Sequence, residues 1–147
     1  NEDDYGRIKN GYSLLKWNSN LEDYSLSYLF LQYVRVQANQ GNGIFKEILS
    51  DANHNYKSIE NITKKYIDSK MTFGNLMTSF RAALFKLDAT GLYGFKGEAG
   101  FNNIETPIYY GTEKQLQGGG AIVLPISGSV KEPENHGENI KFIGLSK

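Results

Sequence analysis

Residues 21–39 read LEDYSLSYLFLQYVRVQAN, and this stretch decides the fold. A helix apolar over much of its circumference is typically central and covered on several sides. Asn20 is the expected N-cap, and Asp23 would face the positive end of the helix dipole, while asparagine and glycine at positions 39–43 mark the end. The apolar side chains fall on two lines of the helix surface and between them: Tyr24, Tyr28, Leu31; Leu26, Phe30, Val34; Leu29, Tyr33, Val36.

Three further helices are expected before residue 91. A two-turn helix covers residues 44–50, the next helix opens at Ser58, and the last opens at Thr72 and stops near Gly91. Phe80 and Leu84 should be core residues of the last helix. That helix follows the 3.6-residue period closely, through Phe73, Leu76, Met77, Phe80, Ala83, Leu84 and Leu87. These segments predict a compact bundle of about four helices.

The composition changes near residue 91. Residues 1–90 hold five of the sixteen glycines and no proline, whereas residues 91–147 hold eleven glycines and all three prolines. Residues 121–126 form the best strand by β-branched content, and the apolar residues 140–145 are its natural pairing partner. The predicted fold is therefore mainly α, with a small C-terminal β-hairpin (α+β).

The chain of 147 residues is long enough for one domain, with a helical part (1–90) and a glycine-rich part (91–147). Because it begins at an asparagine and no signal peptide follows, it is expected to be a domain excised from a longer polypeptide, or the remainder after processing. Sixteen basic and sixteen acidic residues cancel, which disfavours a nucleic-acid partner. No apolar run approaches the ~20 residues of a membrane span.

Few residues offer metal or nucleophile chemistry. There is no cysteine, and the two histidines, His54 and His136, stand in polar loop sequence without a second histidine at helical spacing. The H-E-x-x-H zinc signature is absent. No G-x-S-x-G elbow is present for a serine nucleophile. Self-contained zinc or serine catalysis is thus disfavoured.

The triple glycine at 118–120 could form an oxyanion or phosphate loop, but a strand rather than a helix is expected after it, which favours a tight turn. The paired carboxylates lie in polar surroundings and are expected on solvated faces: Asp3 with Asp4, Glu22 with Asp23, and Glu132 with Glu134. Ten tyrosines are unusually many, and three of them lie on residues 21–39. Packing is the favoured interpretation, while a sugar platform and an oxyanion donor remain alternatives.

Several segments together resemble a known family. They are residues 15–17, 21–33, 44–49, 73–76, 91–95 and 116–122, so the resemblance covers most of residues 12–126. These segments are similar to the region downstream of the zinc site in hyicolysin-like secreted bacterial metallopeptidases of the gluzincin group. In that family an aspartate–tyrosine pair opens a helix that continues as tyrosine–leucine–phenylalanine, and a phenylalanine–lysine–x–isoleucine–leucine helix follows.

The resemblance implies that an upstream lobe holds zinc on H-E-x-x-H and a glutamate, while this chain is the C-terminal helical lobe that closes the cleft. In many gluzincins such a lobe supplies a tyrosine that hydrogen-bonds the tetrahedral oxyanion, in a tyrosine–x–lysine–glycine motif. Tyr24 occupies the matching position, followed here by Leu26 and Ser27 in place of the lysine and glycine.

The expected function is accordingly the C-terminal, non-zinc-binding lobe of a secreted or cell-surface bacterial zinc metallopeptidase. The chain itself would hold no cofactor and be inactive alone. Its partners would be the upstream catalytic lobe of the same polypeptide and a peptide or protein substrate. The main alternative is a non-catalytic interaction or glycan-binding module that uses surface tyrosines, and a lobe retained only for architecture is a third.

Overall fold

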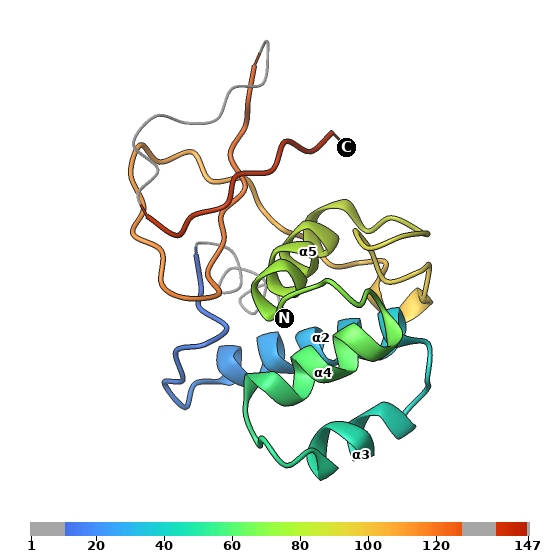
Figure 1. The fold of residues 1–147 in the computed structure, drawn as a ribbon. Coiled ribbons are helices and arrows are strands. Elements are labelled where there is room, and N and C mark those ends of the chain that lie inside the picture. Colours follow the sequence, from blue (N-terminus) through green and yellow to red (C-terminus); the bar gives the residue numbers. More distant parts are fainter. Residues whose placement is uncertain (1–10, 128–137, 147) are drawn as a thin grey trace.

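The computed structural model describes residues 11–127 and 138–146. The predicted bundle of about four helices is confirmed, because four α-helices occur within these residues (Figure 1). A single turn of 3₁₀-helix follows them. The elements are α2 (Leu21–Ala38), α3 (Gly43–Ser50), α4 (Tyr56–Tyr66), α5 (Phe73–Lys86) and η1 (Ala99–Phe101).

The starts of α2, α4 and α5 are set by polar caps. Asn20 is the N-cap of α2, as expected, and Thr72 caps α5 by accepting a hydrogen bond from the backbone N–H of Asn75. Helix α4 begins at Tyr56, two residues before the expected start at Ser58. The reason is that the Asn55 side chain accepts from the N–H of Lys57 at 2.9 Å, which caps the helix earlier.

The end of α5 differs from the expectation at Gly91. The helix stops at Lys86, and Leu87 follows in the left-handed conformation at φ 53°, with its N–H bonded to the Ala83 carbonyl. The chain then turns back, because the Asp88 N–H donates to the Tyr93 carbonyl at 3.0 Å. A Cβ at Gly94 would overlap the Asp88 backbone, so only glycine fits this turn.

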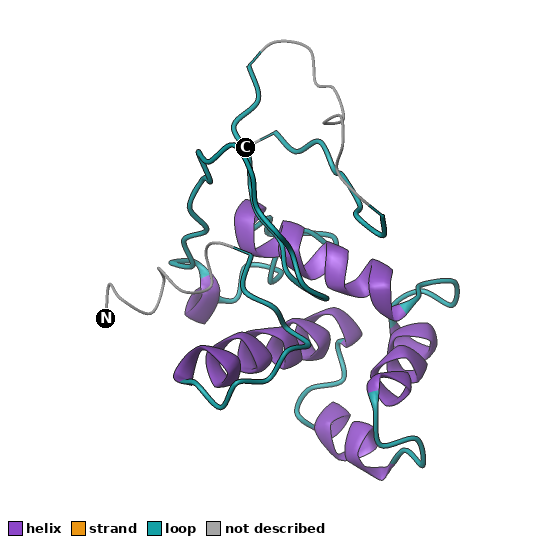
Figure 2. Ribbon diagram, turned by 90° about the vertical axis from the view of Figure 1, so that its left-hand side faces the viewer, coloured by secondary structure: helices purple, strands orange, loops and turns teal. Residues whose placement is uncertain are grey.

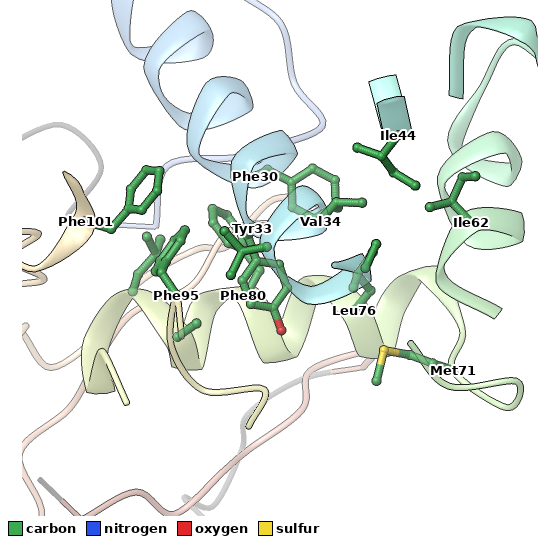
Figure 3. Close-up of a cluster of buried hydrophobic side chains, with 14 of the residues drawn as sticks. Phe30, Tyr33, Val34, Ile44, Ile62, Met71, Leu76, Phe80, Phe95 and Phe101 are labelled. Atoms are coloured by element: carbon green, nitrogen blue, oxygen red, sulfur yellow. The ribbon is translucent and has the colours of Figure 1, made fainter. Parts of the chain in front are cut away.

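The core lies where α2 and α5 meet (Figure 3). Phe80 of α5 is fully buried and packs against Phe30 and Tyr33 of α2, with ring centroids 5.2 and 5.5 Å apart. Leu84 is 2% exposed, so both predicted core residues of α5 are confirmed. Phe95, from the loop after α5, packs against Tyr33 with the two ring centroids 5.8 Å apart, and it extends the core beyond the helices.

The predicted C-terminal hairpin is wrong for the described residues. Residues 121–126 do not pair with residues 140–145; Val123 instead forms one isolated parallel bridge with Ile108. The Tyr109 N–H donates to the Val123 carbonyl at 2.7 Å. The next rung of a parallel ladder would need an N–H at position 125, and Pro125 has none. Figure 2 accordingly shows this part of the chain as loops.

Candidate functional site

The start of α2 carries a group of exposed apolar side chains, called here the α2 aromatic surface: Trp17, Leu21, Tyr24 and Tyr28. Each is between 52% and 60% exposed. Leu21, Tyr24 and Tyr28 share one helix face because they are three and four residues apart. Trp17, from the preceding loop, joins them by packing edge-on against Tyr24. A concentration of large apolar groups at the surface is typical of an interaction site.

Tyr24 is placed in the first turn of α2, and it lies on the surface of the described structure. Its ring centroid is 4.9 Å from the Trp17 ring, at an interplanar angle of 76°. This edge-to-face geometry is the favoured arrangement of two aromatic rings. The contact covers one side of Tyr24 and leaves the side chain 58% exposed.

Asp23, next to Tyr24, is buried rather than on the solvated face expected for the Glu22–Asp23 pair. Its carboxylate accepts hydrogen bonds from the Tyr12 hydroxyl at 2.8 Å and from the backbone N–H groups of Asn18 at 2.7 Å and Asn20 at 3.1 Å. Burial alone would raise the pKa of Asp23, but these donors together hold that pKa below its ordinary value. The carboxylate is thus stabilised in its charged form.

The segment around Tyr12 is joined to the triple glycine by Arg81 of α5. The Arg81 guanidinium donates to the Tyr12 carbonyl at 2.7 Å and to the Gly119 carbonyl at 3.0 Å. Burial lowers the pKa of Arg81 to about 10, so the group remains protonated at neutral pH. The Gly11 N–H also donates to the Ala121 carbonyl at 3.1 Å, which brings the two segments side by side (Figure 1).

The triple glycine forms the tight turn favoured from the sequence. The Gly120 N–H donates to the Gln117 carbonyl at 2.8 Å, and Gly119 lies at φ +74°. A Cβ on Gly120 would come within 2.7 Å of the Gly11 carbonyl oxygen. Glycine is therefore required for the close approach of two backbone segments, which explains this motif without a bound ligand.

A second polar group lies in a hollow of about 330 Å³ between α3 and α4. Asp51 accepts hydrogen bonds from Asn61, Asn53 and Ser58, which hold its pKa far below the ordinary value. Glu47 accepts from Lys65 and from the Tyr66 hydroxyl, and its pKa is lowered too. These carboxylates are engaged in joining two helices.

The remaining candidate residues show no catalytic arrangement. His54 is exposed in the loop before α4, at φ 48°. Tyr33 is fully buried, and burial raises its pKa, while its hydroxyl donates to the Leu92 carbonyl at 2.8 Å, as the packing interpretation expects. Within residues 11–127 and 138–146, no three metal-binding side chains come together. The other candidates lie outside the described residues: Asp3, Asp4, Glu132, Glu134 and His136.

No helix in the described parts of the chain combines the length and apolar character needed to cross a bilayer. The sequence matches no known protein-family profile. The chain is, however, 40% identical over 139 residues to the neutral metalloprotease ShpI of Staphylococcus hyicus. This match covers 92% of the chain and 32% of ShpI, so the chain spans about a third of the length of the curated relative it matches. The resemblance to a bacterial metallopeptidase is thereby confirmed.

Proposed function

We propose that this chain is the C-terminal, non-zinc-binding lobe of a secreted bacterial zinc metallopeptidase and forms one wall of the substrate cleft. The main support is the 40% identity to a third of a neutral metalloprotease. In this proposal the zinc ligands lie in the upstream lobe of the same polypeptide. The exposed α2 aromatic surface supplies a face for the upstream lobe or the substrate.

Within this function, Tyr24 donates a hydrogen bond to the oxyanion that forms when water attacks a peptide carbonyl. Zinc in the upstream lobe would supply the activated water. A phenolic O–H aimed at the developing negative charge stabilises the transition state more than the ground state. The exposure of Tyr24 in the first turn of α2 supports this role, because a donor to a cleft formed with another lobe must lie at the surface.

The test uses the full-length polypeptide with Tyr24→Phe, which removes the hydroxyl and little volume. We expect kcat to fall about 10²- to 10³-fold, with folding unchanged. Tyr28→Phe is a matched control, because Tyr28 lies one turn further along the same face and both side chains are 58% exposed. Normal turnover of the Tyr24 variant, or an equal loss in the Tyr28 variant, would contradict the role.

The 147-residue chain alone is expected to bind no stoichiometric zinc and to cleave no peptide. Elemental analysis after exposure to zinc, followed by dialysis, measures the first property, and a quenched fluorescent peptide library measures the second. A bound equivalent of zinc would contradict the assignment to a non-zinc-binding lobe. So would peptide cleavage that co-purifies with the folded chain through several columns.

A glycan-binding module is the alternative function, and the exposure of Trp17 beside Tyr24 is the observation that favours it. Aromatic rings at a surface form platforms for the apolar faces of sugars. Trp17 is the only tryptophan of the chain, so its emission reports binding directly. A saturable change on titration with an N-acetylglucosamine oligosaccharide, lost in Tyr24→Ala, would support this alternative over the peptidase lobe.

A further inference from the structure

The loop before α2 is held at both ends around Trp17. On one side, the Ser13 hydroxyl oxygen accepts from the Lys16 N–H at 2.9 Å, and the same hydroxyl donates to the Gly118 carbonyl. On the other side, the N–H groups of Asn18 and Asn20 both donate to one oxygen of the Asp23 carboxylate. Trp17 therefore lies in a short loop whose two flanks are fixed by hydrogen bonds.

The two amides that reach Asp23 enclose a strained residue. Ser19 lies between them at φ 60°, a left-handed conformation that non-glycine residues rarely adopt. Such a conformation persists only where its surroundings impose it. Here the Asp23 carboxylate draws both neighbouring N–H groups to a single oxygen, and the Tyr12 hydroxyl occupies the other oxygen. The carboxylate thus determines the path of the chain immediately after Trp17.

The Trp17 and Tyr24 side chains are not fixed by burial in the core. Trp17 is 52% exposed and Tyr24 is 58% exposed, so each side chain would otherwise exchange between rotamers on the nanosecond timescale. Their mutual edge-on contact at 4.9 Å requires the indole to arrive from the loop in one orientation. That orientation follows from the path of residues 18–20, which Asp23 sets.

From these contacts we infer that Asp23 is a positioning residue, which folds the loop of residues 18–20 so that Trp17 holds the ring of Tyr24 in one orientation at the surface. The inference concerns the geometry of the aromatic pair and stands whether or not Tyr24 acts in catalysis. Its catalytic consequence rests on the proposed function: an oxyanion donor works best when its direction is fixed before the reaction.

The first test uses the single tryptophan of the 147-residue chain. Asp23→Asn removes the negative charge and replaces one carboxylate oxygen by an NH₂ group. With the amide oxygen kept on the two backbone N–H groups, the NH₂ would donate to the Tyr12 hydroxyl instead of accepting from it, so the charge-assisted hydrogen bonds that hold the loop are weakened. We expect acrylamide quenching of Trp17 to rise about twofold and its fluorescence anisotropy to fall, because the indole is freed. Tyr12→Phe should change the quenching and the anisotropy of Trp17 in the same directions but by smaller amounts. It replaces Asp23→Asn as the test variant if Asp23→Asn does not fold.

Asp51→Asn is the matched control. Asp51 also accepts several hydrogen bonds in a loop before a helix, but that helix is α4, and none of these bonds involves the loop before α2. A lowered stability in Asp51→Asn with an unchanged Trp17 signal would separate positioning from general stabilisation. Wild-type quenching in both Asp23→Asn and Tyr12→Phe, or an equal change in Asp51→Asn, would overturn the inference.

The second test measures turnover of the full-length polypeptide carrying Asp23→Asn. If Tyr24 is the oxyanion donor, we expect kcat to fall about 10- to 100-fold with KM unchanged, because a misdirected donor weakens only the transition state. A freed Trp17 together with normal turnover of both Asp23→Asn and Tyr24→Phe would leave the positioning inference standing and contradict the catalytic role proposed for Tyr24. Unchanged quenching and anisotropy of Trp17 in Asp23→Asn and Tyr12→Phe, together with low turnover of Tyr24→Phe, would contradict the positioning inference and leave the catalytic role of Tyr24 standing.

Discussion

The helical part of the molecule and the loops that follow α5 are held by different forces. Helices α2 to α5 bury apolar side chains against one another, with Phe80 and Leu76 fully buried between them. The loops from residue 87 to residue 127 form one isolated bridge and one turn of 3₁₀-helix. Besides backbone hydrogen bonds within the loops, several of their carbonyls accept hydrogen bonds from side chains of the helices. Gln37 of α2, for example, donates to the carbonyls of Gly91 and Gly94.

This difference explains why polar side chains occur inside the helical part. A backbone carbonyl without a partner is costly to bury, and a loop lacks neighbouring strands to satisfy it. Gln37, Tyr33 and Arg81 lie on helices, yet each donates to a carbonyl of the glycine-rich part. The helices therefore supply both the apolar core and the hydrogen bonds that give the loops their shape.

The largest expected effect comes from the helical part. Phe80→Ala should lower the free energy of unfolding by about 3–5 kcal/mol and Leu84→Ala by about 2–5 kcal/mol, because each leaves a cavity where α2 and α5 meet. Urea denaturation followed by far-UV circular dichroism measures both. Leu49→Ala is the control, since Leu49 is 77% exposed. A denaturation midpoint equal to that of the wild type in both core variants would contradict the packing.

Arg81→Met tests the hydrogen-bonded part. Loss of a charged donor to two carbonyls should cost about 1.5–3 kcal/mol. We also expect faster hydrogen exchange at the amides of Gly11 and Gly120, since the two segments that Arg81 joins would separate more often. Lys86→Met on the same helix removes a surface ion pair with Asp88 and should cost less than about 1 kcal/mol. Uniformly faster exchange across all helices would argue against a local role of Arg81.

The smallest effect is expected in acid, and it should appear first between α3 and α4. The lowered pKa of Asp51 means that its contribution to stability is complete above the ordinary carboxyl pKa of 3.8 and is lost as the pH falls below about 4. The pKa of Glu47 is lowered as well, so its contribution to stability is also lost as the pH falls. Gln37 and Arg81 do not titrate in this range, so the loops should keep their protection.

Hydrogen exchange measured from pH 5 to pH 2.5 checks this order, with intrinsic rates corrected for pH. In Asp51→Asn, the hydrogen-exchange protection of α3 and α4 should depend less on pH than in the wild type. If the amides of residues 91–94 lost protection before those of α4, the assignment of the two kinds of stabilisation would be wrong.

The helices could be predicted because their signals are local. The 3.6-residue period identified α5 and its buried residues Phe80 and Leu84, and the asparagine and threonine caps fixed the starts of α2 and α5. The end of α5 was placed too late, because the left-handed conformation of Leu87 depends on the return of the chain at Asp88. The predicted hairpin was wrong because the prediction relied on the β-branched residues of the segment 121–126. It did not take into account that Pro125 has no N–H to donate.

At the candidate site, the family resemblance pointed to Tyr24, and its catalytic role stays a prediction. Asp23 was expected on a solvated face, but it is buried and accepts a hydrogen bond from the Tyr12 hydroxyl. Three donors reach Asp23 from positions 12, 18 and 20, before the first helical residue, and helical periodicity does not describe such contacts. Arg81 went unnoticed for a similar reason, since an arginine within an apolar helix is ordinarily solvent-facing.

Pro125 affects how the protein behaves at high concentration. It stands between Leu124 and Ile126, which are 37% and 45% exposed, in a segment rich in β-branched residues. A continuous run of this kind would offer its free edge to the same segment of another molecule and seed cross-β stacking. With no amide hydrogen at its centre, the segment cannot sustain such a ladder. The proline that interrupts strand pairing at residues 121–126 thereby protects the protein from aggregating through the same residues.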